Sequence, residues 1–123
     1  MKYKLIKRSN PRDKKDEKWY ASPVNEGKIS KTDIAKEIVN MSSLSRGDVS
    51  NVIENLLDTM PKYLLMGKSI NLGEFGTLRV SFSSKGVVKP EEFNTSLVKG
   101  AKIIFTPSVE LKNSLKGLKF EKI

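Results

Sequence analysis

The stretch from Gly67 to Phe82, GKSINLGEFGTLRVSF, decides which fold the sequence predicts. Two glycines, Gly73 and Gly76, enclose Phe75 between two short runs in which polar and apolar residues alternate. Glycine permits positive φ and close backbone approach, so the pair predicts a tight turn that joins two strands. Turns are normally polar, which makes the aromatic residue unusual. We therefore expect Phe75 to be buried and to fix the hairpin against the helices before it.

Two helices are predicted before this turn. The first begins at Ser30-Lys31-Thr32-Asp33, where a hydroxyl can accept from an unpaired N–H and Asp33 suits the positive end of the helix dipole. The second begins at Ser45 and keeps apolar residues at helical spacing from Val49 to Leu64. We expect this second stripe to form core and dimer interface.

Two residues mark breaks in the second helix. Pro61 cannot donate a hydrogen bond and clashes with the preceding turn. It predicts either a kink near Leu57–Pro61 or two abutting helices. Gly67 predicts a C′ cap that ends the helix.

Three strands and a final helix are predicted around and after the turn. The strands are Ile70–Leu72, Thr77–Ser83 and Lys99–Thr106, and residues 84–98 between the last two are irregular. Alternation in the second strand predicts one dry and one wet face, formed by Leu78, Val80 and Phe82 on one side and Thr77, Arg79 and Ser81 on the other. Pro107-Ser108 then starts a short helix that ends near Lys116.

The two ends of the chain predict a further β structure. Met1–Lys7 and Trp19–Val24 lean towards strands, while Arg8–Lys18 is polar and charged and predicts a flexible basic loop. The tail after Gly117 alternates again and is expected to add a strand beside this hairpin. Trp19 and Tyr20 are expected in the core, with stacking on bases as the alternative.

Composition limits both the size of the core and the chemistry. The chain has 123 residues, which make one domain. Its low hydrophobic fraction of 37% favours a dimer with a shared core, with an ordinary charged monomer as the alternative. There is no Cys and no His, which excludes disulfides, thiolate zinc sites and serine–histidine triads and fits a cytoplasmic protein. No apolar run is long enough for a membrane span, and the basic N-terminus lacks the apolar core of a signal peptide.

The net charge of +9 is concentrated at the start of the chain. Residues 1–31 hold ten Lys and Arg against four Asp and Glu, whereas the remainder holds 13 against 10. A positive patch of this kind attracts polyanions and releases counterions when it meets phosphates. Charge alone leaves nucleic-acid binding and simple solubility equally open.

The Gly73–Thr77 turn after a helical pair resembles the bacterial histone-like HU/IHF proteins. Further points of resemblance are Gly67 and the entry Phe105-Thr106-Pro107-Ser108 into the last helix. The resemblance covers residues 28–116. Residues 1–27, an N-terminal β-hairpin extension with a basic loop, and residues 117–123, a tail with an added strand, resemble a longer HU-related subgroup.

The resemblance implies an α+β fold of the IHF-like intertwined dimer type. In that fold a helical base carries a three-stranded sheet, from which two β-arms reach around DNA through the minor groove, and a proline near each tip wedges between base steps. The implied function is a low-specificity architectural protein that bends or compacts double-stranded DNA in the nucleoid. No enzyme activity, cofactor, metal, membrane or small-molecule substrate is implied. A dimeric scaffold with weak or no DNA binding is the alternative, and RNA binding stays open.

The expected DNA contacts fall into two groups. Those of the β-arm are Lys85, Lys89, Pro90, Lys99 and Lys102, with Arg79 on the wet face of the preceding strand as a further phosphate contact. Those of the densest basic stretch, in the N-terminal loop, are Lys7, Arg8, Arg12, Lys14, Lys15 and Lys18. The chain departs from the family pattern at several positions. Glu91-Glu92 would repel phosphates, and Ser81, Ser83 and Glu110 stand where relatives often carry basic residues. Pro90 is accordingly open to two interpretations: the wedge, or an ordinary loop proline that starts a short helical turn through Phe93.

Overall fold

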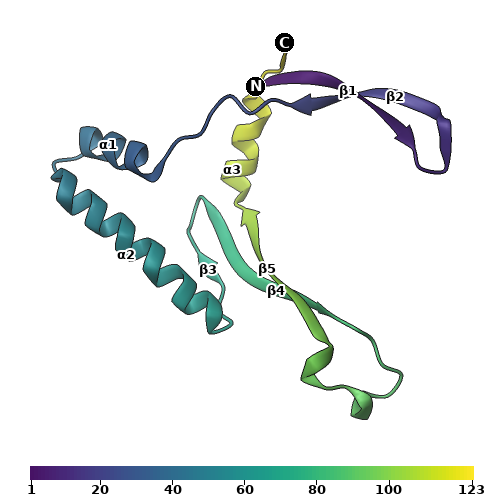
Figure 1. Ribbon diagram of the computed structural model, residues 1–123. Helices are drawn as coiled ribbons and strands as arrows, with labels where there is room; N and C mark the ends of the chain where they lie inside the picture. Colours follow the sequence, from purple (N-terminus) through teal and green to yellow (C-terminus); the bar gives the residue numbers. More distant parts are fainter.

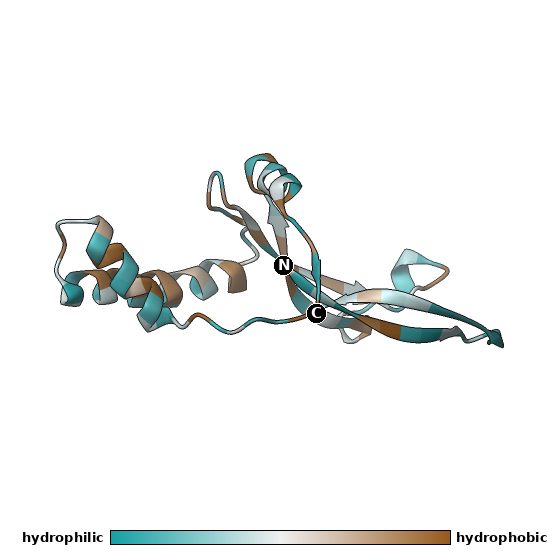
Figure 2. Cartoon of the chain, turned by 90° about the horizontal axis from the view of Figure 1, so that it is seen from above, coloured by the Kyte–Doolittle hydropathy of each residue, from teal (hydrophilic) through white to brown (hydrophobic).

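A computed structural model describes residues 1–123 and shows a mixed α+β chain with three α-helices and two three-stranded sheets (Figure 1). The elements are β1 (Lys2–Asn10), β2 (Asp13–Pro23), α1 (Lys31–Met41), α2 (Arg46–Leu65), β3 (Ile70–Asn71), β4 (Gly76–Ser84), β5 (Val98–Pro107), α3 (Val109–Ser114) and β6 (Glu121–Lys122). The α1–α2 pair lies to one side of the chain, while the β1–β2 and β4–β5 hairpins project away from it in different directions (Figures 1 and 2).

The predicted helix ends are confirmed. At the start of α1, the Ser30 hydroxyl accepts from the Asp33 N–H and the Asp33 carboxylate accepts from the Ser30 N–H, which forms a capping box. Ser45 caps α2 in the same way by accepting from the Asp48 N–H. Gly67, with φ of +78°, ends α2 as its N–H bonds the Leu64 carbonyl.

Pro61 lies inside one continuous helix, so the prediction of two abutting helices is wrong. A proline at this position removes the hydrogen bond to the carbonyl of Leu57. Both residues are exposed, so water can satisfy that carbonyl, and the apolar face of α2 continues past the proline. The helix therefore keeps its packing from Val49 to Leu64, both of which are buried.

The glycine turn forms as predicted, but Phe75 is not buried against the helices. Its ring packs on Phe105 of β5, with the ring centroids 5.0 Å apart, and it remains more than half exposed. The turn is instead tied to the start of α3, because the Ser108 N–H donates to the Phe75 carbonyl over 3.1 Å. Ser108 also donates its hydroxyl to the Glu74 carbonyl and accepts from the Leu111 N–H.

The first sheet has the order β3-β4-β5, and all its strands are antiparallel. Register runs from Gly76 opposite Pro107 at the base to Ser84 opposite Val98 at the far end. Between residues 84 and 98 the chain forms a loop with two single-turn 3-10 helices, η1 (Pro90–Glu92) and η2 (Thr95–Leu97). The predicted irregular segment is thus confirmed and has local structure.

The second sheet has the order β2-β1-β6 and corrects one prediction. Arg8–Lys18, expected as a flexible loop, lies almost wholly within β1 and β2, which meet at a tight turn at Pro11 and Arg12. The Lys7–Glu17 ion pair, 2.7 Å long, spans the two strands in this charged region. The tail strand is confirmed, since β6 pairs with β1 in parallel.

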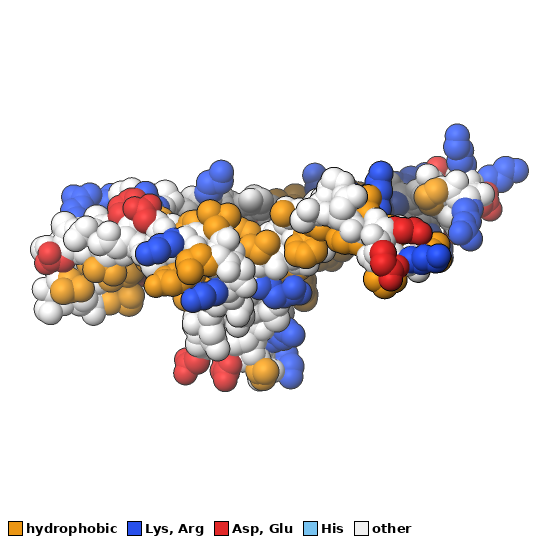
Figure 3. Space-filling view, turned by 90° about the horizontal axis from the view of Figure 1, so that it is seen from below, with side chains coloured by type: hydrophobic (Ala, Val, Ile, Leu, Met, Phe, Trp, Pro, Cys, Tyr) orange, Lys and Arg blue, Asp and Glu red, His pale blue; other side chains and the backbone are white.

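Few side chains are buried within the chain. The buried apolar residues are Ala35, Val49 and Leu64, and Val52 in the α2 stripe is 60% exposed. The accessible surface is 10619 Å², whereas a folded monomer of this mass exposes about 6,600 Å². The projecting hairpins account for part of the excess. Exposed apolar side chains of the helices and sheets contribute as well, and some are seen on the helical side of Figure 3.

Candidate nucleic-acid interface

One face of the β4–β5 hairpin gathers three of the predicted basic residues. Directly opposed residues in an antiparallel pair share a face, and Arg79, Ser81 and Ser83 alternate along β4. Lys102 lies opposite Ser81, and Lys99 lies opposite Ser83. The register therefore places Arg79, Lys99 and Lys102 on one face, which we call the β4–β5 basic row.

A β-bulge makes this alignment possible. Lys99 and Lys102 are three residues apart, which in a regular strand would place them on opposite faces. Between Ser81 and Ser83 the register shifts, so that Gly100 and Ala101 together stand opposite a single residue of β4. Gly100 has φ of +68°, the left-handed conformation that favours glycine at the first position of such a bulge.

The loop at the far end of this hairpin holds the remaining predicted residues of the arm. Lys85 follows β4 directly, and its N–H donates to the Leu97 carbonyl. Lys89 precedes η1, which begins at Pro90, and the Phe93 N–H bonds the Pro90 carbonyl over 3.1 Å. This is the helical turn expected of an ordinary loop proline. Glu91 and Glu92 belong to the same turn.

The β1–β2 hairpin has two unlike faces. On one, residues Tyr3, Leu5 and Lys7 lie opposite Pro23, Ala21 and Trp19. We call this the apolar face; its apolar residues are Tyr3, Leu5, Trp19, Ala21 and Pro23, together with Phe120 from the tail, and Lys7 and Glu17 follow on it towards the tip. On the other, Lys4, Ile6 and Arg8 lie opposite Ser22, Tyr20 and Lys18. We call this the basic face, after its three cations Lys4, Arg8 and Lys18.

The register separates residues that the sequence grouped together. Lys7 lies on the apolar face, paired with Glu17, with its Nζ 5.9 Å from the centre of the Trp19 ring. Arg8 lies on the basic face, with its guanidinium carbon 5.9 Å from the centre of the Tyr20 ring. The expectation of a buried Trp19 and Tyr20 is wrong for the protomer, since the two are 64% and 46% exposed.

The tip of this hairpin is organised by short side-chain contacts. The Arg12 N–H donates to the Asn10 side-chain oxygen and the Lys15 N–H donates to Asp13, each over 3.0 Å. These contacts hold the turn and leave Arg12, Lys14 and Lys15 exposed. Figure 3 shows Lys and Arg side chains gathered at this end of the molecule, with few acidic ones among them.

Lys4 is a candidate residue that was not among the predicted contacts, whereas Lys18 belonged to the predicted basic stretch. They share a face with Arg8 only because β1 and β2 pair in this register. The period-two spacing of Lys2, Lys4 and Arg8 in the sequence is the signal that could have identified Lys4. Lys18 could be assigned to this face only from the pairing.

The chain has neither a metal-binding cluster nor a helix that could span a membrane. No group of three or more metal-binding side chains comes together. None of the helices combines the length and the apolar character needed to cross a membrane.

Comparisons with solved structures support the fold. A protein named "Putative bacterial DNA binding protein from Bacteroides vulgatus ATCC 8482" superposes with a TM-score of 0.62 over 99% of this chain at 18% identity. This chain spans only 47% of that protein. A point mutant of HU from Thermotoga maritima superposes with a TM-score of 0.53 at 17% identity, over 71% of this chain and 99% of the HU chain.

Comparisons of sequence identify the family. No curated protein matches the chain significantly. The family model described as "HU-HIG: HU domain fused to wHTH, Ig, or Glycine-rich motif" matches residues 1–122, which is nearly the whole chain. The predicted resemblance to HU is confirmed, and the chain belongs to the HU-HIG family.

Proposed function

We propose that this chain is an architectural DNA-binding protein that acts as a homodimer and bends or compacts double-stranded DNA with low sequence specificity. The observation that carries the proposal is the β4–β5 basic row, in which a bulge brings Lys99, Lys102 and Arg79 onto one face. Family membership supports the same ligand. A DNA-binding family of this kind also supports a location in the bacterial nucleoid and cytoplasm and a function without catalysis, cofactor or metal.

In the proposed mechanism the basic residues of the β4–β5 hairpin contact the DNA backbone. The β4–β5 hairpin serves as the arm, and Lys85 and Lys89 extend its positive charge towards the tip. Cations at these positions neutralise phosphates and release counterions, which gives affinity without reading bases. Ser81 between the cations offers a hydroxyl donor to phosphate oxygens, whereas the Ser83 hydroxyl donates to the Lys99 carbonyl within the hairpin. Specificity then follows from how readily a DNA segment deforms.

The N-terminal hairpin adds a second contact region in this proposal. Its basic face and its tip, with Arg12, Lys14 and Lys15, meet the backbone alongside the arm. Lys7 contributes less, because Glu17 already neutralises it. Pro90 acts as a wedge only if η1 unwinds on binding, since it is now the first residue of a helical turn.

A dimeric scaffold that binds DNA weakly or not at all is the second candidate. The observation in its favour is the acidic pair Glu91 and Glu92 at the end of the hairpin, where a DNA-wrapping arm would carry cations. In this case the same fold would present its surfaces to a protein partner.

A salt-dependent titration separates the two candidates. Intact and nicked duplexes of equal length are titrated with the protein at two salt concentrations. An architectural protein binds both, prefers the nicked duplex because it bends more easily, and loses affinity steeply as salt rises. A failure to bind either duplex near physiological salt supports the scaffold.

The contribution of the N-terminal tip is tested by replacing Lys14 and Lys15 with Gln. Each lost phosphate contact lowers the slope of log affinity against log salt by about 0.9. We expect the double substitution to lower the slope by nearly twice that amount. The matched control is Lys36→Gln with Lys62→Gln on the helices, which removes equal charge away from both hairpins. An unchanged slope in the tip variant would remove the hairpin from the interface.

A further inference from the structure

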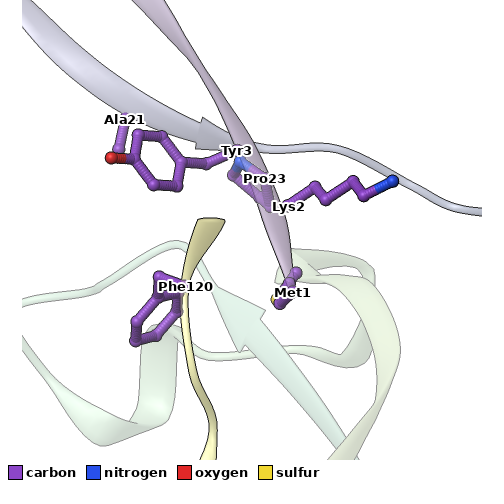
Figure 4. Close-up of a pocket in the computed structure, with 6 residues that line it drawn as sticks. All are labelled: Met1, Lys2, Tyr3, Ala21, Pro23 and Phe120. Carbon is purple, nitrogen blue, oxygen red and sulfur yellow. The ribbon is translucent and has the colours of Figure 1, made fainter. Parts of the chain in front are cut away.

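The apolar face of the N-terminal sheet has no partner within the chain. Tyr3, beside Ala21, and Phe120 lie on opposite sides of a gap, with their rings directed to the same side (Figure 4). Together with Met1, Lys2 and Pro23 they line an open hollow of about 500 Å³. Lys2 adds little charge there, because its amine lies 3.8 Å from Glu26. The hollow is therefore an apolar surface exposed to water.

The apolar character continues along the hairpin towards its tip. Leu5 is 43% exposed and Trp19 is 64% exposed, and both lie on the same face as the hollow. The charged residues that follow on this face, Lys7 and Glu17, neutralise each other. A neutral pair at the border of an apolar surface is typical of the polar rim around a protein–protein interface.

We propose that a second copy of this chain covers the apolar face, so that the N-terminal sheet is part of the interface between two protomers. This inference rests on the homodimer proposed above and assigns it a surface that lies outside the HU-like part of the fold. DNA does not suit the apolar face, because that face offers no unpaired cation from Tyr3 to Trp19.

The surface of the protomer supports a second copy as the partner. It exceeds that of a folded monomer of this mass by about 4,000 Å², whereas a standard interface buries about 800 Å² on each partner. The excess includes apolar side chains on other elements that can meet the apolar face, such as Val109 of α3 and Leu115 directly after it, both well exposed. Each chain thus exposes both the apolar face and apolar side chains that can pack against the apolar face of a second copy.

The proposal fixes the orientation of the hairpin. Adjacent residues of a strand point to opposite faces. If Trp19 faces the partner protomer, Tyr20, Arg8 and Lys18 face outward, where they can meet DNA. The dimer contact and the DNA contact then use opposite faces of the same two strands.

The single tryptophan of the chain provides the test. Sedimentation measures the fraction of dimer over a range of protein concentrations, and acrylamide quenching of Trp19 fluorescence is measured at the same concentrations without DNA. We expect Trp19 to become shielded and its emission to shift to the blue as dimer forms. Because this measurement uses the unmodified chain, misfolding of a variant cannot obscure the result.

A matched pair of substitutions extends the test. Trp19→Lys should raise the dissociation constant of the dimer at least tenfold, whereas Tyr20→Lys, one residue away on the basic face, should leave it unchanged. A stable dimer in which Trp19 stays fully accessible overturns this inference but leaves the proposed function intact. Shielding of Trp19 only after DNA is added overturns it equally. A protein that remains monomeric at every concentration overturns both proposals.

Discussion

Gly76 illustrates how one residue without a side chain sets the geometry of the central turn. A Cβ at this position would lie 2.4 Å from the Thr106 carbonyl oxygen and 2.6 Å from the Phe105 ring. Its φ of +151° is also one that other residues rarely adopt. The sequence predicted a special backbone conformation here, but the close approach of β5 could be seen only in the structure.

Replacing Gly76 with Ala is expected to destabilise the fold by about 3 kcal/mol, since the new methyl group forces β4 and β5 apart and strains the backbone. Gly73→Ala is the matched control, because nothing lies within 4 Å of the place that its new methyl group would occupy and only its φ of +61° is unfavourable. It should cost about 1 kcal/mol. Chemical denaturation of both variants measures the difference, and equal losses would contradict the steric argument.

Asp33 gives a prediction about pH. Hydrogen bonds from the backbone N–H and then the hydroxyl of Ser30 lower the pKa of its carboxyl below the usual value. A lowered pKa in the folded state means that the ionised carboxylate stabilises the fold above its ordinary pKa, near pH 4, and that this contribution is lost as pH falls further. Asp33→Asn should therefore be less stable than the natural chain at pH 6, with the gap narrowing by pH 3. If the difference in urea midpoint between the natural chain and Asp33→Asn does not change with pH, ionisation of Asp33 does not contribute to stability in this way.

At the scale of elements, the segments with clear periodicity were predictable and those without it were not. The helix caps at Ser30 and Ser45 and the strands around the glycine turn follow from local sequence. The charged stretch Arg8–Lys18 shows no hydrophobic alternation, so it resembled a loop. Its strands are held by the backbone ladder and by cross-strand pairs such as Lys7–Glu17, which sequence alone does not indicate.

The candidate interface was predictable to a similar extent. The basic residues of β4 and β5 could be named from the sequence as DNA contacts, which stays a prediction, but Lys99 and Lys102 share a face only because of the bulge at Gly100. The division of the N-terminal hairpin into two faces required the register of β1 and β2. Side-chain alternation is readable from sequence, whereas a bulge or a pairing partner depends on the strand opposite.

The bulge yields a prediction of its own. Gly100→Ala places a Cβ 3.3 Å from the Ser83 hydroxyl and strains a residue with φ of +68°. If the bulge rearranges, Lys99 leaves the β4–β5 basic row, and the salt slope of DNA binding falls by about 0.9 although the net charge is unchanged. Gly86→Ala in the adjoining loop, where nothing lies within 4 Å and φ is not positive, is the control. Identical slopes for the two variants would show that the bulge does not serve DNA binding.

The whole protomer is open, with most of its large apolar side chains exposed, and this determines how it should unfold. A dimer that buries these side chains is stabilised by mass action, so its melting temperature rises with protein concentration. We expect a clear rise between micromolar and hundred-micromolar protein, followed by calorimetry or circular dichroism. A melting temperature independent of concentration would indicate that the protomer folds alone, against the proposed homodimer.

The assignment of residues 1–27, 28–116 and 117–123 to an extension, an HU-like domain and a tail stays a prediction. The pairing of β6 with β1 brings the first and the last of these segments into one sheet. Figure 1 accordingly shows both termini at the same end of the molecule. The extension and the tail should therefore be removed or retained together in any truncation.

Side chains alternate between the two faces of the N-terminal hairpin, and this alternation limits which insertions the hairpin can accept. Inserting one residue before Trp19 within β2 would move the side chains on one side of the insertion to the opposite face of the hairpin, unless a bulge like that at Gly100 absorbed the extra residue. Inserting two residues would lengthen the hairpin and leave each side chain on its present face. The fold should consequently tolerate insertions of an even number of residues in this hairpin better than insertions of an odd number.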